Sequence, residues 1–194
     1  MSERQVIQNC SPTMAGLKTG SLFCCDAKTR EELNNSVRDF NNRLVPKGVR
    51  FLPMRYRNGR ALVYMYRPDR LENDLKKSRA KDILKKREYP VKSSELCIVE
   101  LMKRIKSGNE FPHEIGLFLG YPPEDVDGFI NNGAKGAKCV GTWKVYGDES
   151  IAKRTFAQYK KCTKVYENAY DRHKSFDRLV VSFQKYNIMK EGLL

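Results

Sequence analysis

Two residues of this sequence have side chains suited to nucleophilic catalysis, Cys10 and His113. Ser11-Pro12 is typical of a helix start, so we expect Cys10 at a helix N-terminus, where the dipole favours the thiolate. Glu114 follows the histidine and is a candidate to orient it. A thiol, a histidine and an orienting polar group are the minimum for thiol catalysis, so the pattern predicts a papain-like hydrolase. The alternative is that Cys10 is a small buried residue and that His113 hydrogen-bonds a loop.

A second group of residues indicates binding rather than catalysis. The net charge is +14, and most of it lies between Arg43 and Lys92, where 16 Lys and Arg residues accompany 5 Asp and Glu residues. A charge so concentrated attracts anions over a Debye length of about 8–10 Å. We expect a positive face that engages an acidic protein or a nucleic acid; the alternative is a surface that only keeps the protein solvated. The residues predicted to contact the partner or its phosphates are Arg55, Arg57, Arg60, Arg67, Lys76, Lys77, Lys85 and Lys86.

Other classes of site and location have no support in the sequence. The six cysteines form no CxxC pair and no Cys/His ligand spacing, so we expect reduced thiols and no metal site. The segment 133–138 lacks the order of a phosphate-binding loop, and the sequence identifies no cofactor. No run of about 18 apolar residues occurs, and no apolar segment follows the first residues as in a secretory signal. A cytoplasmic protein with no membrane span is expected.

The elements that must position these residues follow from local signals. A helix is predicted from Ser11 through the apolar residues up to Phe23, and a second after the capping box at Thr29. The clearest signal is Asn58-Gly59 between two aromatic-rich runs, which predicts a hairpin with a type I′ turn. Pro53 then predicts that the first strand lies at an edge of the sheet or is broken there. Arginine and tyrosine alternate along this hairpin, a pattern that can hold phosphates and stack bases.

The second half of the chain is predicted to be mainly helical. Helices are expected from Pro68, from Ser93 or Ser94, and from Ile151 to Tyr170, with a strand around Trp143. The order of elements predicts a single α+β domain over residues 1–194. Its small antiparallel sheet would combine the hairpin with the Trp143 strand, packed with several helices.

Residues 110–131 have two interpretations. An apolar run of the right length for a strand begins at Ile115, and the papain-like hypothesis requires that strand. As two short helices, the segment would break at Gly120 and restart at Pro123, with acidic residues in the first turn of the second helix. We favour the helix pair, and the absence of Lys and Arg from this segment argues against its reading DNA.

Four blocks of the chain together resemble a known family. They are residues 9–23, 61–68, 111–126 and 141–146, of which Phe111-Pro112-His113-Glu114 is the most distinctive. The sequence resembles the domain-of-unknown-function family 3793, found mainly in anaerobic Firmicutes. That resemblance implies a bacterial, single-domain, cytoplasmic protein and supplies no activity.

The leading hypothesis is therefore a basic, non-catalytic binding or accessory protein that engages an acidic partner through residues 43–92. The alternative is a thiol-dependent enzyme that uses Cys10 and His113. The two differ in what they require, because the first tolerates loss of Cys10 and the second tolerates reversal of the charge at Arg55, Arg57 and Arg60. The sequence leaves the oligomeric state open.

Overall fold

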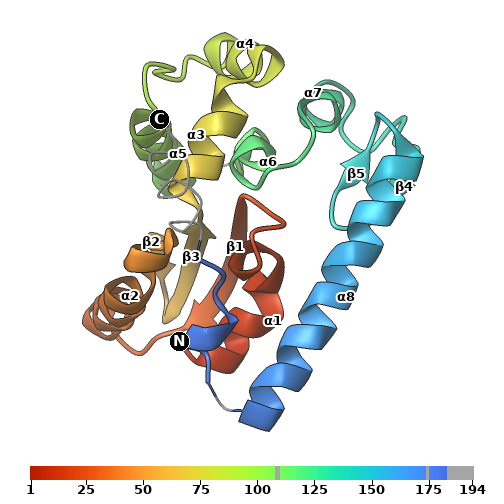
Figure 1. The fold of residues 1–194 in the computed structure, drawn as a ribbon. Helices are drawn as coiled ribbons and strands as arrows, with labels where there is room; N and C mark the ends of the chain where they lie inside the picture. Colours follow the sequence, from red (N-terminus) through yellow and green to blue (C-terminus); the bar gives the residue numbers. More distant parts are fainter. Residues whose placement is uncertain (108–109, 174, 183–194) are drawn as a thin grey trace, which may run out of the picture.

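A three-stranded antiparallel sheet forms the centre of the computed structural model, which describes residues 1–107, 110–173 and 175–182. The outer strands β1 (Gly20–Asp26) and β2 (Arg50–Arg57) both pair with β3 (Arg60–Tyr66). Helices lie on both sides of this sheet, and the α+β class is confirmed (Figure 1). The other elements are α1 (Glu3–Met14), α2 (Arg30–Leu44), η1 (Val45–Lys47), α3 (Pro68–Lys76), α4 (Ser78–Lys86), α5 (Ser94–Ser107), α6 (Ile115–Phe118), α7 (Pro123–Asn132), β4 (Cys139–Val140), β5 (Lys144–Val145), α8 (Glu149–His173) and η2 (Asp177–Leu179).

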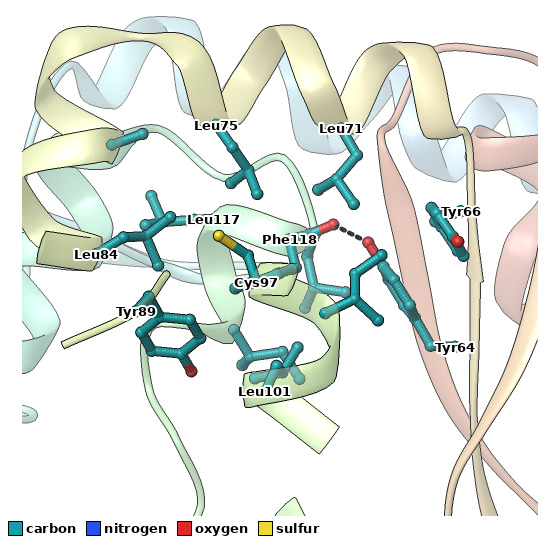
Figure 2. Close-up of a cluster of buried hydrophobic side chains, with 14 of the residues drawn as sticks. Tyr64, Tyr66, Leu71, Leu75, Leu84, Tyr89, Cys97, Leu101, Leu117 and Phe118 are labelled. Carbon is teal, nitrogen blue, oxygen red and sulfur yellow. Dashed lines mark hydrogen bonds between the residues drawn. The ribbon is translucent and has the colours of Figure 1, made fainter. Parts of the chain in front are cut away.

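Alternate side chains of the central strand serve two hydrophobic clusters, one on each face of the sheet. Ala61, Val63 and Met65 pack with residues of α1 and α2. On the opposite face, Leu62, Tyr64 and Tyr66 pack with residues of α3 to α7. Figure 2 shows the second cluster, in which the Tyr64 hydroxyl donates to the backbone carbonyl of Phe118. The period of two along β3 therefore places a helical layer on each face.

The predicted hairpin is confirmed. Asn58 and Gly59 have φ values of 50° and 76°, both positive as a type I′ turn requires. β2 lies at an edge of the sheet, as Pro53 predicted.

A β-bulge interrupts the same edge strand. The pairing register with β3 shifts between Pro53 and Arg55, so Met54 is the extra residue. A bulge reverses the alternation of the side chains that follow it. Phe51 before the bulge and Tyr56 after it accordingly pack against the same cluster, on the side of α2.

The first predicted helix is wrong in its bounds. α1 begins at Glu3, where the Ser2 side chain accepts a hydrogen bond from the Gln5 backbone N–H at 3.2 Å, and Pro12 lies inside it. The helix starts early because residues on one side of it, Val6 among them, are buried in the core. Residues 20–26 form strand β1, not the continuation of a helix, because Gly16, with φ of 74°, ends the helical segment.

The third strand of the sheet also differs from the prediction. β1 takes that position, and the segment around Trp143 forms a separate two-stranded sheet of β4 and β5. Trp143 itself lies in the turn between them. The aromatic run at residues 141–146 indicated a strand, but β5 has only two residues. Because it is so short, it pairs with β4, its neighbour in the sequence.

Most of the other helix signals are confirmed. Thr29 caps α2 by accepting from the Glu32 backbone N–H at 3.0 Å, and Ser93 accepts from Leu96 in the same way at 3.2 Å. The helix pair is the correct interpretation of residues 110–131, since α6 is followed by Gly120 with φ of 78° and by α7 with a proline in its first turn.

Candidate functional site

Cys10 lies in the interior of α1, not at a helix N-terminus. Its side chain is fully buried in the cluster that also contains Val63 of β3. Burial raises the pKa of the thiol far above its ordinary value of 9.0, although the Lys18 charge and a hydrogen bond with Ser21 act to lower it. A buried thiol of raised pKa is a weak nucleophile. The dipole argument for an activated Cys10 therefore does not apply.

His113 and Glu114 are directed to different environments. Glu114 is buried and accepts hydrogen bonds from the Tyr89 hydroxyl at 2.9 Å and from Nη1 of Arg104 at 3.3 Å. His113 is exposed and meets the edge of the Phe129 ring, with 4.7 Å between ring centroids. Within the described residues, no hydrogen bond joins Cys10, His113 and Glu114 in any pair, and the structure does not bring them together.

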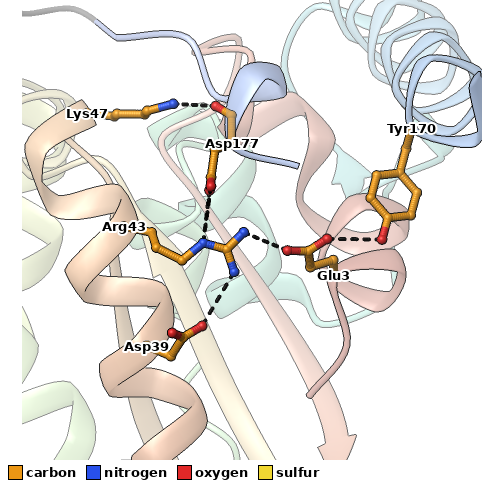
Figure 3. Close-up of polar contacts among 6 residues, drawn as sticks. All are labelled: Glu3, Asp39, Arg43, Lys47, Tyr170 and Asp177. Atoms are coloured by element: carbon orange, nitrogen blue, oxygen red, sulfur yellow. Dashed lines mark hydrogen bonds and ion pairs between the residues drawn. The ribbon is translucent and has the colours of Figure 1, made fainter. Parts of the chain in front are cut away.

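Two arginines of the basic stretch are used inside the protein. Arg43 pairs with Glu3 at 2.6 Å and with Asp177 at 3.0 Å, joining α1, α2 and η2 (Figure 3). Burial alone would lower its pKa, but these two carboxylates outweigh that effect and the pKa is raised. Arg67, predicted to contact a partner, is only 2% exposed, and burial lowers the pKa of its guanidinium to about 10.

Arg67 has a structural position at the end of α1. Its Nε donates to the carbonyl of Thr13 at 2.7 Å, and its Nη2 donates to those of Met14 at 2.6 Å and Val181 at 2.8 Å. A guanidinium at a helix C-terminus satisfies carbonyls that have no helical partner and matches the dipole. The prediction that Arg67 faces a partner is corrected on this ground.

Of the four predicted lysines, two form ion pairs and two form none with the residues that the structure describes. Lys76 pairs with Glu72 at 2.5 Å and Lys77 with Asp74 at 2.6 Å. Lys85 and Lys86 are exposed at the end of α4. Arg60 is exposed as well and lies 3.9 Å from Asp26.

Arg55 and Arg57 lie in a groove beside the edge strand β2. The groove has a volume of about 530 Å³ and is lined by β2 together with residues of α2 and α5. We call it the basic groove, because four of its side chains are cationic and none is a carboxylate. Its lining residues are Arg30, Leu33, Asn34, Pro53, Arg55, Tyr56, Arg57, Met102 and Lys106.

The cations of the basic groove are not neutralised within the described part of the chain. None of Arg30, Arg55, Arg57 and Lys106 forms an ion pair with a residue of 1–107, 110–173 or 175–182. Arg30 instead stacks 5.9 Å from the ring centroid of Tyr56, whose hydroxyl donates to the carbonyl of Lys28 at 3.0 Å. An anion entering the groove would therefore meet free charge.

Of the tyrosines that alternate with arginines, only Tyr56 reaches the groove. Tyr64 and Tyr66 are buried, with parallel rings 4.8 Å apart and in contact with the core (Figure 2). The hypothesis that these two rings stack on bases is therefore wrong. Tyr64 and Tyr66 belong to the central strand β3, and helices cover both faces of the sheet there.

Sequence reasoning missed two of the four groove cations. Arg30 follows the helix cap Thr29 directly, and Lys106 lies outside the basic stretch 43–92. Arg30 also lies outside that stretch, and only the packing of α2 against β2 brings it into the groove. Nothing local marks Lys106, because α5 reaches β2 only through the tertiary fold.

Metal and membrane sites have little basis in the described residues. No cluster of three His, Cys, Asp or Glu side chains in 1–107, 110–173 and 175–182 is arranged to hold a metal ion. None of the helices in those ranges has the length and hydropathy needed to cross a bilayer.

Comparisons with known proteins give a family but no activity. Neither the curated proteins nor the solved structures include a match to this chain. A family described as "Protein of unknown function (DUF3793)" matches over residues 6–180. That span contains the whole sheet and every lining residue of the basic groove. The chain belongs to the DUF3793 family.

Proposed function

We propose that this protein is a non-catalytic binding protein that engages an anionic partner through the basic groove. The observation that carries the proposal is the lining of the groove, which holds four cations and no carboxylate. A concave site of one sign concentrates the field and raises the local concentration of counter-ions. Its cations come from three elements, α2, β2 and α5, so an anionic chain that lies in the groove can contact all three.

A single-stranded nucleic acid is the first partner class to test. Arginine forks suit phosphate oxygens, and Tyr56 with Asn34 supplies a ring and an amide within the same groove. Proteins that bind single strands combine such a charged groove with an aromatic platform. An acidic protein surface is the other partner class that carries negative charge. A binding test with nucleic acid distinguishes the two classes.

The test is fluorescence anisotropy of labelled single-stranded RNA and DNA at about 50 and 200 mM salt. Full occupation of the four cations predicts a slope of log K against log salt of about −3, since each phosphate contributes about 0.7 for single strands. Replacing Arg55 and Arg57 with Glu should weaken binding at least about tenfold. The matched control is the double change Lys85→Glu and Lys86→Glu, which alters the net charge equally on α4.

Loss confined to the Arg55 and Arg57 variant supports the groove as the phosphate site. Equal loss in the Lys85 and Lys86 variant would show a general charge effect and contradict the groove. Absence of binding at the lower salt removes nucleic acid and leaves an acidic protein as the partner of the same residues.

A further inference from the structure

A second cavity lies between α6, α7 and the segment around β5. Its volume is about 220 Å³, and it shares no lining residue with the basic groove. Ile115, Val126 and Phe129 are among its apolar lining residues. Small-molecule pockets commonly measure about 300–1,000 Å³, so this cavity suits a molecule of one ring or two.

The aromatic wall of the cavity is held rigidly. The Trp143 ring stacks on Tyr121 with centroids 4.8 Å apart, and it meets the edge of Phe156 at 4.5 Å. Its Nε1 also donates to Asp125 at 2.6 Å. A wall fixed before binding loses little conformational entropy when a ligand enters, which favours affinity for flat rings.

Among the described lining residues of the cavity, the positive charge has no ion-pair partner and the carboxylate is already hydrogen-bonded. Asp125 is the one carboxylate among these described lining residues, and both oxygens already accept hydrogen bonds, Oδ1 from the N–H groups of Tyr146 and Gly147 and Oδ2 from Trp143. Lys144 lies over the Phe129 ring, with Nζ 5.0 Å from the centroid. It forms no ion pair with any residue in the described ranges. The cavity therefore presents a free ammonium group and no free carboxylate.

We propose that this cavity binds a small aromatic carboxylate. The ring lies against Phe129 and Trp143, and the carboxylate accepts a hydrogen bond from Nζ of Lys144. Burial of the ring supplies the apolar contribution, and a partly desolvated ammonium group strengthens the hydrogen bond to a charged acceptor. A cationic ligand of the same shape is repelled by Lys144 and finds the Asp125 oxygens occupied.

The full chain carries its own reporter for this site, because Trp143 is its only tryptophan. We would follow Trp143 emission while adding phenylacetate, phenylacetamide or 2-phenylethylamine, which share one ring and differ in the charge of the head group. Phenylacetate should bind at least about fivefold more tightly than the neutral amide, and the amine should bind most weakly. This ranking is measured on the unaltered protein and does not depend on any variant.

The variant test uses a lysine at the cavity and one away from it. Lys144→Met keeps the aliphatic stem, and it should abolish the preference for phenylacetate over the amide, because neither probe then meets a positive charge. Lys135→Met, on an exposed loop, should leave the ranking as in the parent protein. The proposal is overturned if the amine binds as tightly as phenylacetate, if Lys144→Met keeps the preference, or if no probe changes the emission at about 20 mM.

Discussion

The indole N–H of Trp143 donates a hydrogen bond of 2.6 Å to Oδ2 of Asp125. The second oxygen of that carboxylate accepts two backbone N–H groups, those of Tyr146 and Gly147, each at 2.7 Å. Asp125 is 3% exposed. One buried side chain in the first turn of α7 thus fixes β5, the turn before it and the residues after it, as well as one wall of the second cavity.

Replacing Asp125 with Asn should therefore destabilise the protein by about 2–4 kcal/mol. Asparagine can still accept from the two backbone groups, but its amide nitrogen then faces the indole N–H, and two donors cannot bond each other. The free energy of unfolding would be measured by urea titration with circular dichroism. Asp127→Asn, which loses a more exposed pair with Arg79 at 3.6 Å, serves as control and should cost under about 1 kcal/mol. Equal losses of unfolding free energy in the two variants would contradict the structural role of the Asp125 carboxylate.

The second prediction concerns Arg67, a buried residue of the basic stretch. Arg67→Met removes the guanidinium donor shared by the carbonyls of Thr13, Met14 and Val181, of which the first two keep one backbone N–H donor each, and it should reduce the free energy of unfolding by about 1–3 kcal/mol. The same change at the exposed Arg55 should alter stability by less than about 0.5 kcal/mol. Both variants would be compared by thermal and urea unfolding. A similar cost at the two positions would contradict a structural role specific to Arg67.

The elements that could be predicted from the sequence are those with a local physical cause. Asn58-Gly59 requires positive φ at two successive positions, and only a few residue types accept that conformation. Thr29 and Ser93 cap helices because their hydroxyl groups reach backbone N–H groups three residues on. In each case, the deciding interaction lies within a few residues of the signal.

The candidate site depended on interactions that no local signal contains. Arg55 on β2 and Arg67 directly after β3 are the same residue type, yet one is exposed in a groove and the other is buried under a helix end. The bulge at Met54 determines which side chains of β2 face α2, and Pro53 marks an edge or interrupted strand without identifying the extra residue. Lys106 joins the groove only because α5 packs against β2. Charge counting could find the basic stretch but could not sort its surface from its interior.

The placement of Cys10 predicts its reactivity. Its thiol is fully buried and its pKa is raised by burial, whereas Cys24 is exposed on β1. Iodoacetamide at about pH 8 should therefore label Cys24 in the native protein and reach Cys10 only after unfolding. Peptide mass spectrometry over a time course would give the rate at each site. Cys24→Ser should remove the fastest labelling and Cys10→Ser should not. Rapid native labelling of Cys10 would contradict the buried position and restore the thiol-enzyme hypothesis.

Lys18 has an unusually low pKa for a lysine. It is 8% exposed, and its ammonium lies 5.2 Å from the ring centroid of Tyr121. Burial lowers the pKa of Lys18 to about 8 from its ordinary 10.5. Between these two values, the unfolded chain binds a proton at this site that the folded chain has released. The contribution of Lys18 to the free energy of unfolding therefore rises with pH across that window, and below it the full cost of a buried charge remains.

Lys18→Met removes that cost and should stabilise the protein by about 1–3 kcal/mol at about pH 7. The advantage over the parent protein should shrink as the pH rises from about 8 and disappear near 10.5, because a neutral lysine no longer differs from methionine in charge. Urea unfolding of both proteins across this range measures the difference, and groups common to both cancel. Lys28→Met, on an exposed lysine, should show no such dependence. If the gain from Lys18→Met stayed constant with pH, the buried ammonium would not be its cause.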